Sequence, residues 1–511
     1  MSKELSHKAV KDVAGLFGAQ LSVQAMSVFL SAWLIHQVPA DDLALWPLVI
    51  GIASIIVGLS SLGLGDYLVR VVPKLVASGE KEGAGRVLRT GLLMNVVATV
   101  LIAAAAYVYA EPVGQLLLRK PGQADVIRLL LAPSVLLALG DHLQWAMRSL
   151  DMLGGIALLN LLSGGLRLPM MVGLFLVAGT RGMVAGIAFA ALVRVVFPVL
   201  WLRRWLFGRA LDLRLVAEAS PYYGAALASL GVGRARYLLI SALGTPAMLA
   251  AYFVAEKIAD LLDGLSAAVT TAAAPKLSMK VGESVEEYKD AVRKAMRYFY
   301  WAFVPVCALL VLYARPLMRL YGGPQYAGDF GLLAVLAGSY LFRLPYGLLY
   351  EAIKVACKPV FLPATHVVVG GASIALLAVG VSVAKAWGAA ASVVVAHMLG
   401  TVVAYAFLKR GVGPVNLLDG FRMGAAVFCL AVLFAIGIEL AGDQANQLVL
   451  LVAAGVAFAA AYLLILRGNL MPSESRAVWA LVPGRLRAWP WVRGLERVSF
   501  RYCTGQSEAM R

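Results

Sequence analysis

The chain has 511 residues, of which 61% are hydrophobic and 14% charged, and its formal net charge is +17. Its mean hydropathy of +0.82 excludes a soluble globular protein, because so few charged residues cannot cover that much apolar surface. The basic excess is typical of the cytoplasmic loops of membrane proteins, where lysine and arginine collect, rather than of a nucleic-acid-binding surface.

The hydrophobic stretches predict an all-α, polytopic membrane protein, because a helix needs about 20 mostly apolar residues to cross the hydrocarbon core. The first stretch is too long for the core of a signal peptide, so we expect it to remain as a helix. About fourteen transmembrane helices are expected, over residues 12–35, 44–65, 90–110, 126–147, 153–178, 183–202, 220–243, 247–272, 298–314, 330–352, 360–382, 387–408, 423–441 and 446–466.

The basic residues of the loops orient these helices. With the N-terminus inside, 32 lysines and arginines fall in inside segments and 7 in outside segments. The positive-inside rule therefore predicts a multi-pass protein of the cytoplasmic (inner) membrane with both termini in the cytoplasm.

Short outside loops leave no room for a catalytic domain, and the sequence has neither His-Glu-x-x-His nor a phosphate-binding glycine loop with lysine. The four cysteines lie at no spacing typical of metal ligands or of a redox pair. We therefore expect a transporter rather than an enzyme, with no catalytic residue, metal or cofactor.

Two passages recur at nearly constant offset and indicate an internal duplication. Pro-Lys-Leu occurs at 73–75 and at 275–277, and residues 178–182 correspond to 384–388, with their glycines 206 residues apart. Two six-helix lobes of the same orientation are thus expected in a pseudo-two-fold arrangement, which in transporters places the substrate site between the repeats. The expected organisation is an N-terminal lobe of helices 1–6 (1–203), a cytoplasmic linker (204–219), a C-terminal lobe of helices 7–12 (220–410), helices 13 and 14 (411–467) and a basic, interfacial cytoplasmic tail (468–511).

Six cationic side chains lie near the middle of predicted spans, where a charge costs about 2.5–3.5 kcal/mol on insertion scales. Such residues normally face the bundle interior or a water-filled cavity. Guanidinium groups bind phosphate oxygens in a bidentate fashion, so these residues are candidates for binding a lipid diphosphate and its saccharide, with ion pairing between helices as the alternative. They are Arg167, Arg194, Arg234, Arg236, Lys257 and Arg343.

Acidic residues in the eighth and fourth spans are candidates for ion coupling. Glu256, Asp260 and Asp263 have i, i+4 and i+7 spacing, which puts three carboxylates on one stripe of a helix. The stripe is either a cation or proton site or an ion-paired seam with span seven through Arg234 or Arg236. Asp141 and His142 form a second titratable pair, whose alternative is the polar lining of a kink or a wet cavity.

Two local patterns concern helix packing and helix starts. Gly182 and Gly186 have the spacing that lets two helices approach closely. Residues 284–287 (SVEE) read as a capping box that begins a cytoplasmic helix leading into span nine.

Several passages resemble the polysaccharide-transporter family, the flippases of O-antigen and exopolysaccharide units within the multidrug/oligosaccharidyl-lipid/polysaccharide flippase superfamily. They are residues 63–73 (GLGDYLVRVVP), the passage from 236 to 278, and 320–327 (LYGGPQYA), within a resemblance that covers roughly 10–410. One departure is Ala235, where many members carry an acid, so an ion-coupling role of that acid cannot be transferred to this chain.

The resemblance implies a flippase that moves polyprenyl-diphosphate-linked oligosaccharide units across the cytoplasmic membrane by alternating access, for surface or exported polysaccharide. Its partners would be the lipid bilayer, that lipid-linked substrate and a polysaccharide polymerase or export machinery, and not nucleic acid. The alternative is a cation-coupled multidrug or small-solute exporter of the same superfamily. A cavity richer in cations than in anions disfavours that alternative, because such exporters bind cationic amphiphiles.

Overall fold

A computed structural model describes residues 27–38, 43–118, 124–208, 236–263, 284–357, 361–440 and 447–469, and a few single positions between 210 and 277. These residues are almost entirely helical, and none of them forms a strand. After a helix over 27–37, the elements are α3 (Leu45–Ser60), α4 (Leu64–Ala77), α5 (Lys81–Val108), α6 (Ala110–Leu118), α7 (Ala124–Ser149), α8 (Leu153–Leu206), α10 (Arg236–Leu243), α11 (Pro246–Ala259), α13 (Val285–Leu312), α14 (Ala314–Gly322), η1 (Pro324–Asp329), α15 (Phe330–Ala356), α16 (Phe361–Val412), α17 (Leu418–Leu440) and α18 (Gln447–Asn469).

The polytopic membrane fold is confirmed. Within the described residues, eight helical segments are long and apolar enough to cross a membrane, and two shorter apolar ones occupy 46–60 and 449–463. One of the eight, Ala364–Val412, has 49 residues, which is the length of two spans. Parts of the predicted first, seventh and eighth helices lie outside the described residues.

The long helices α8 and α16 are each two spans joined by a sharp bend. The backbone leaves helical geometry at Ala178 and Gly179 in α8, and 206 residues later at Ala384 and Lys385 in α16. Gly179 has φ 59° and Lys385 φ 49°, a left-handed conformation that glycine adopts without steric cost and lysine does not. The repeated sequence thus forms the same bent hairpin twice.

Glycines let the two arms of each hairpin touch. A Cβ atom on Gly182 would overlap the carbonyl oxygen of Leu174, and one on Gly388 would overlap that of Gly380. A Cβ atom on Gly186 would lie 2.6 Å from the backbone nitrogen of Met171. The close packing predicted for Gly182 and Gly186 is confirmed, and its first contact recurs in the second hairpin.

A second duplicated unit was only partly predicted. α5 and α13 each have 28 residues, and each is followed by a nine-residue helix, α6 or α14. α5 begins at Lys81, before the predicted start at 90, and α13 at Val285, before the predicted start at 298, because each helix includes charged turns that hydropathy does not count. At the start of α13 the Ser284 hydroxyl accepts a hydrogen bond from the Glu287 N–H at 3.1 Å, which confirms the serine half of the predicted capping box.

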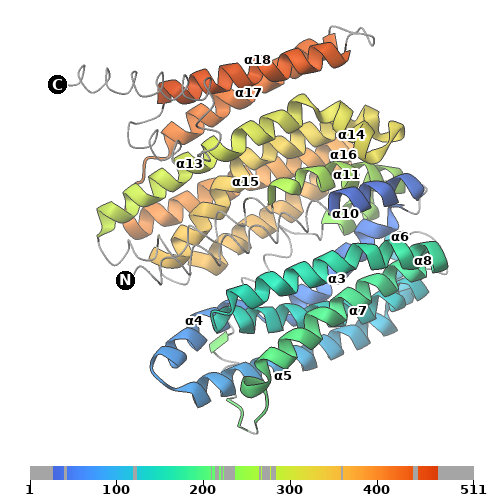
Figure 1. Ribbon diagram of the computed structural model, residues 1–511, viewed down its shortest axis with the longest axis vertical. Coiled ribbons are helices and arrows are strands. Elements are labelled where there is room, and N and C mark those ends of the chain that lie inside the picture. Colours follow the sequence, from blue (N-terminus) through green and yellow to red (C-terminus); the bar gives the residue numbers. More distant parts are fainter. Residues whose placement is uncertain are drawn as a thin grey trace, which may run out of the picture.

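The helices form two bundles (Figure 1). α3 to α8 make up the first bundle and α10 to α16 the second, and α17 and α18 lie beside α13 on the side away from the first bundle. The main contacts between the bundles are made by α3 and α6 with α10 and α11. This is the end at which α5 and α13 finish, called here the outer end because it is predicted to face outside.

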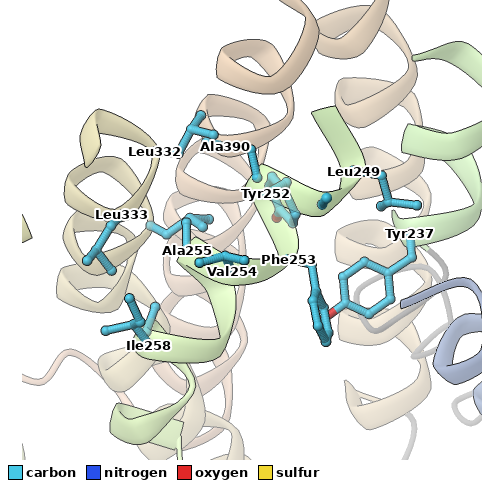
Figure 2. Packing of buried hydrophobic residues seen from close by; sticks show 14 of the residues in the cluster. Tyr237, Leu249, Tyr252, Phe253, Val254, Ala255, Ile258, Leu332, Leu333 and Ala390 are labelled. Atoms are coloured by element: carbon cyan, nitrogen blue, oxygen red, sulfur yellow. The ribbon is translucent and has the colours of Figure 1, made fainter. Parts of the chain in front are cut away.

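A hydrophobic core shared by both bundles closes the outer end. Trp46 of α3 lies against Phe253 of α11, with ring centroids 5.4 Å apart, and Phe253 also meets Tyr237 of α10 (Figure 2). The buried hydroxyl groups of Ser31 and Tyr321 are 2.6 Å apart, which links the helix over 27–37 to α14. Aromatic packing therefore joins the two bundles here, and the buried hydrogen bond attaches the helix over 27–37, which precedes α3 along the chain, to the second bundle.

At the opposite, inner end the bundles have separate cores in the part of the chain that the structure describes. The first bundle packs around residues of α4, α5, α7 and α8, among them Leu68, Leu88, Leu143, Leu159 and Leu202. The second packs around residues of α13, α15 and α16, among them Tyr288, Val292, Leu349, Ile353 and Leu408. The described residues thus show a molecule whose halves are joined at the outer end.

Candidate functional site

Charged residues of both bundles lie at similar depth in the membrane. An α-helix rises 1.5 Å per residue, so Arg343 in α15 and Asp260 just after α11 lie about 20 Å from the outer ends of their helices. Arg194 and Arg167, on the two arms of α8, lie about 23 Å and about 17 Å from its outer bend. With a hydrocarbon core about 30 Å thick, all four lie inside it, between its middle and its inner half.

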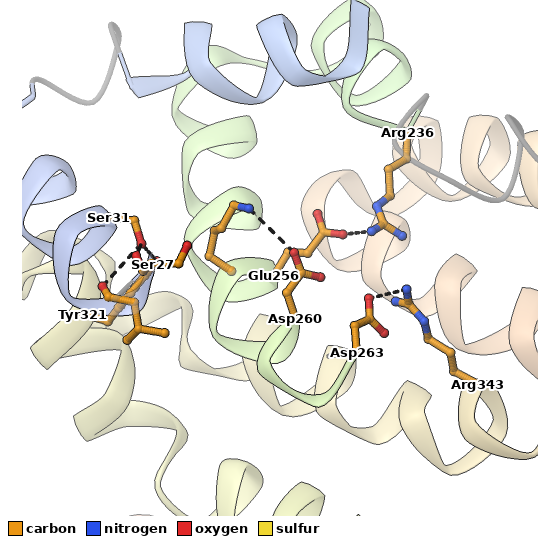
Figure 3. A network of polar contacts seen from close by, with 10 residues as sticks. Ser27, Ser31, Arg236, Glu256, Asp260, Asp263, Tyr321 and Arg343 are labelled. Carbon is orange, nitrogen blue, oxygen red and sulfur yellow. Dashed lines mark hydrogen bonds and ion pairs between the residues drawn. The ribbon is translucent and has the colours of Figure 1, made fainter. Parts of the chain in front are cut away.

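In the second bundle the cations and carboxylates are paired with one another (Figure 3). Arg236 of α10 forms an ion pair with Glu256 of α11. Arg343 Nη2 of α15 is 2.5 Å from Asp263 Oδ2, and Lys257 Nζ is 3.8 Å from Asp260 Oδ2. These six residues are called the paired cluster below: Arg236, Glu256, Lys257, Asp260, Asp263 and Arg343.

The pair between Arg236 and Glu256 is the seam with span seven that the sequence left as one of two alternatives. Its side chains are only 10% and 4% exposed. Breaking a buried ion pair by removing one partner costs about 3–5 kcal/mol, because the other charge stays buried and uncompensated. This pair therefore fixes α11 to α10.

The other two pairs are more accessible. Arg343 and Asp263 are 29% and 34% exposed, and Lys257 and Asp260 are 23% and 29% exposed. Charged side chains at this depth that are not fully covered by protein normally face a water-filled cavity rather than lipid. The cluster thus has a buried end at Arg236 and an accessible end at Arg343.

Polar atoms at the buried end lack hydrogen-bond partners within the described part. They are Arg236 Nε, Glu256 Oε2 and the Tyr252 hydroxyl. A cavity of about 20 Å³ lies beside Arg236, lined in part by Ser373, Ser392 and His397. Buried polar atoms are usually satisfied by protein, water or ligand, and this volume has room for about one water molecule.

In the first bundle, a second set of polar side chains surrounds Arg194. Arg194 Nη2 is 2.8 Å from Asp141 Oδ1 of α7 and donates a hydrogen bond of 3.0 Å to Gln144 Oε1. Gln144 in turn donates to Asn160 Oδ1 at 2.8 Å. A Cβ atom on Gly140 would lie 2.9 Å from Arg194 Cβ, so the absence of a side chain there lets α8 approach α7.

Asp141 and His142, predicted as one titratable pair, have different surroundings. Asp141 reaches Arg194, whereas His142 is only 4% exposed and packs against Gly91 of α5. Successive residues of a helix point about 100° apart, which accounts for the separation.

The remaining predicted residues have different outcomes. Arg167 is exposed on α8, and Arg234 lies outside the described residues. Sequence reasoning missed Gln144, Asn160 and His397, although polar side chains inside apolar spans were a usable signal. No group of three or more His, Cys, Asp or Glu residues positioned for a metal ion occurs among the residues searched, which are those the structure describes.

Solved structures with this fold are transporters. The lipid II flippase MurJ in an inward-closed conformation superposes with a TM-score of 0.66 at 12% identity, covering 88% of this chain and 98% of MurJ. The MATE transporter VcmN of Vibrio cholerae in its bent form gives 0.59 at 16% identity, covering 82% and 98%. A transporter of the MOP superfamily from Pyrococcus furiosus gives 0.58 at 17% identity, covering 82% and 96%. At these identities the likeness establishes the fold.

Among curated proteins, none matches this sequence. The family model described as "Polysaccharide biosynthesis protein" matches residues 43–328. This match begins near the start of α3 and ends in η1. It includes α7 and α8, which carry Asp141 and Arg194, and α10 and α11, which carry part of the paired cluster. Because it covers more than half of the chain, the protein belongs to the polysaccharide biosynthesis protein family, and it has the membrane fold that MurJ and the MATE transporters share.

Proposed function

We propose that this protein is a flippase that carries polyprenyl-diphosphate-linked oligosaccharide units across the cytoplasmic membrane for a surface or exported polysaccharide. The observation that carries the proposal is the presence of arginine-containing polar groups at mid-membrane depth in both bundles of a polysaccharide biosynthesis family member. An oligosaccharide diphosphate is the polar part of such a substrate, and it needs polar partners at that depth.

Arginines of α8 are the proposed ligands of the diphosphate. Arg194 and Arg167 lie on opposite arms of one hairpin, within about 6 Å of each other in depth. A guanidinium offers a planar fork of donors that matches phosphate oxygens. Arg167 is exposed at a depth where lipid is a poor environment for a charge, which supports its facing a cavity between the bundles.

Asp141 is the proposed coupling residue, because it shares Arg194 with the substrate. Its carboxylate is 2.8 Å from the Arg194 guanidinium. A diphosphate that binds Arg194 competes with Asp141, and a proton taken up by Asp141 releases the guanidinium for the phosphate. Proton uptake and substrate binding would then favour each other, as linkage requires of two ligands that stabilise one state.

The closed outer end supports alternating access that begins from the cytoplasmic side. Contacts between Trp46 and Phe253, and between Ser31 and Tyr321, would separate as the outer end opens. Separate inner cores allow the bundles to move as two bodies.

The experiment that tests the function is a deletion of the gene. Loss of surface polysaccharide, with lipid-linked precursor accumulating in the cytoplasmic leaflet, is expected. The likeness to MATE transporters favours a second candidate, a cation-coupled exporter of small amphiphiles. Normal polysaccharide and precursor together with increased sensitivity to cationic drugs would replace the flippase by that exporter.

A further inference from the structure

We propose that the paired cluster of the second bundle is the saccharide subsite of this transporter, separate from the arginines that bind the diphosphate. This inference rests on the proposed function and divides the substrate between the two bundles. The accessible part of the paired cluster consists of Asp260, Asp263, Lys257 and Arg343.

Charge balance is the first argument. The cluster contains three cations and three carboxylates, all in ion pairs with one another. A diphosphate placed there would lie as close to the Asp260 and Asp263 carboxylates as to the cations, and like charges at short range repel. A balanced cluster therefore does not favour an anion.

Hydrogen-bonding capacity is the second argument. A sugar hydroxyl donates one hydrogen bond and accepts others, so it can bridge a carboxylate acceptor and a guanidinium donor at the same time. Asp263 Oδ2 is such an acceptor and Arg343 Nη2 such a donor, 2.5 Å apart, and both side chains are about one third exposed. Lys257 and Asp260 repeat the arrangement one turn away on the same helix.

Further polar and aromatic groups extend the site. The buried Tyr340 ring lies 5.1 Å from the Arg343 guanidinium carbon, a cation–π contact that holds this guanidinium in place. At the buried end, Glu256 Oε2 and Arg236 Nε have no hydrogen-bond partner in the described part, although these side chains are only 4% and 10% exposed. These unpaired atoms are the second observation that distinguishes the cluster from a purely structural network.

The partners of Arg194 in the first bundle differ from those in the paired cluster, as a separate diphosphate site would require. There a single carboxylate, Asp141, faces Arg194, and the other partner is the neutral amide of Gln144. Arg167 lies at similar depth on the same hairpin. Among the described contacts Arg194 thus faces one carboxylate, whereas the accessible part of the paired cluster holds two, Asp260 and Asp263.

Binding of two lipids by the purified full-length protein tests the division. One probe is undecaprenyl diphosphate, which has no saccharide, and the other is the lipid-linked precursor extracted from cells that lack the gene. Asp260→Asn removes one charge from a weak pair and is expected to reduce affinity for the precursor about tenfold or more, the effect of losing a hydrogen bond to a charged group. Affinity for undecaprenyl diphosphate is expected to stay within about twofold.

Asp290→Asn is the matched control, because Asp290 is also paired with basic side chains, those of Arg293 and Lys294, but in the charged first turns of α13. It should leave both affinities unchanged. Arg194→Gln should reduce the affinity for both probes, because both carry the diphosphate.

Three outcomes for Asp260→Asn would overturn the saccharide subsite. Equal losses for both probes would make the cluster a phosphate site, and unchanged affinities would make it structural. Unchanged affinities together with transport that no longer responds to a proton gradient would make it a coupling site. If the unaltered protein binds neither probe, the proposed function fails first, and the two failures are thus distinguishable.

Discussion

Replacing Arg194 by glutamine is expected to stop polysaccharide export while the protein still inserts into the membrane. The substitution removes the charge and the fork of donors that we assign to the diphosphate, and hydrogen bonds to charged groups contribute about 1.5–3 kcal/mol each. Loss of two such bonds would reduce transport at least about a hundredfold. Export is measured as surface polysaccharide in a deletion strain that carries the variant gene.

Controls separate binding from folding in this experiment. Arg194→Gln leaves Asp141 without its ion pair, so the double variant Arg194→Gln/Asp141→Asn restores a neutral, hydrogen-bonded pair. We expect this double variant to insert normally and still not to export. Arg128→Gln is the matched control, because Arg128 pairs with Asp125 at 3.3 Å near the outer end of α7, outside the proposed site. Normal export by the Arg194→Gln variant would contradict the assignment of the phosphate site.

A covalent link between Ser31 and Tyr321 is expected to arrest transport reversibly. Their hydroxyl groups are 2.6 Å apart at the outer end, where they join the helix over 27–37, which leads into α3 of the first bundle, to α14 of the second. Ser31→Cys and Tyr321→Cys, in a chain whose four native cysteines are replaced by serine, would be joined by a short bifunctional thiol reagent that a reductant cleaves. A direct disulfide is not expected, because the tyrosine hydroxyl lies at the far end of its ring from Cβ.

The link should form readily in the absence of substrate, since the outer end is closed in this structure. Transport should fall to the level of the deletion strain and return when the linker is cleaved. A pair within the second half, Tyr313→Cys and Leu451→Cys, is the control, because the Tyr313 hydroxyl donates to the Leu451 carbonyl at 3.0 Å without joining the bundles. Undiminished transport by the protein linked between residues 31 and 321 would show that the outer end need not open.

Much of the fold follows from hydropathy and repetition. Long apolar runs predicted the spans because the hydrocarbon core sets their length. The duplicated passages at 178–182 and 384–388 marked the place where both hairpins bend. Helices α6 and α14 were not predicted, because their charged and proline-containing segments resemble loops when only mean hydropathy is considered.

The sequence predicted many of the residues of the site, but not which of them form ion pairs with one another. Helical spacing put Glu256, Asp260 and Asp263 on one stripe, but two of their partners, Arg236 and Arg343, come from other helices. The partner of Asp141 is Arg194, more than fifty residues away. Such contacts depend on how helices pack, which a single sequence does not specify. Three of the predicted candidates for binding the diphosphate and its saccharide, Arg236, Lys257 and Arg343, each lie in an ion pair with a carboxylate.

Transfer of the lipid-linked precursor between leaflets by the purified protein in liposomes tests the flippase proposal most directly. Precursor is placed in both leaflets, and the fraction accessible to a membrane-impermeant reagent that modifies its saccharide is followed over time. We expect liposomes with the protein to expose nearly all of the precursor, and those with the Arg194→Gln variant to match protein-free liposomes. Equal exposure with and without the unaltered protein would contradict the flippase function.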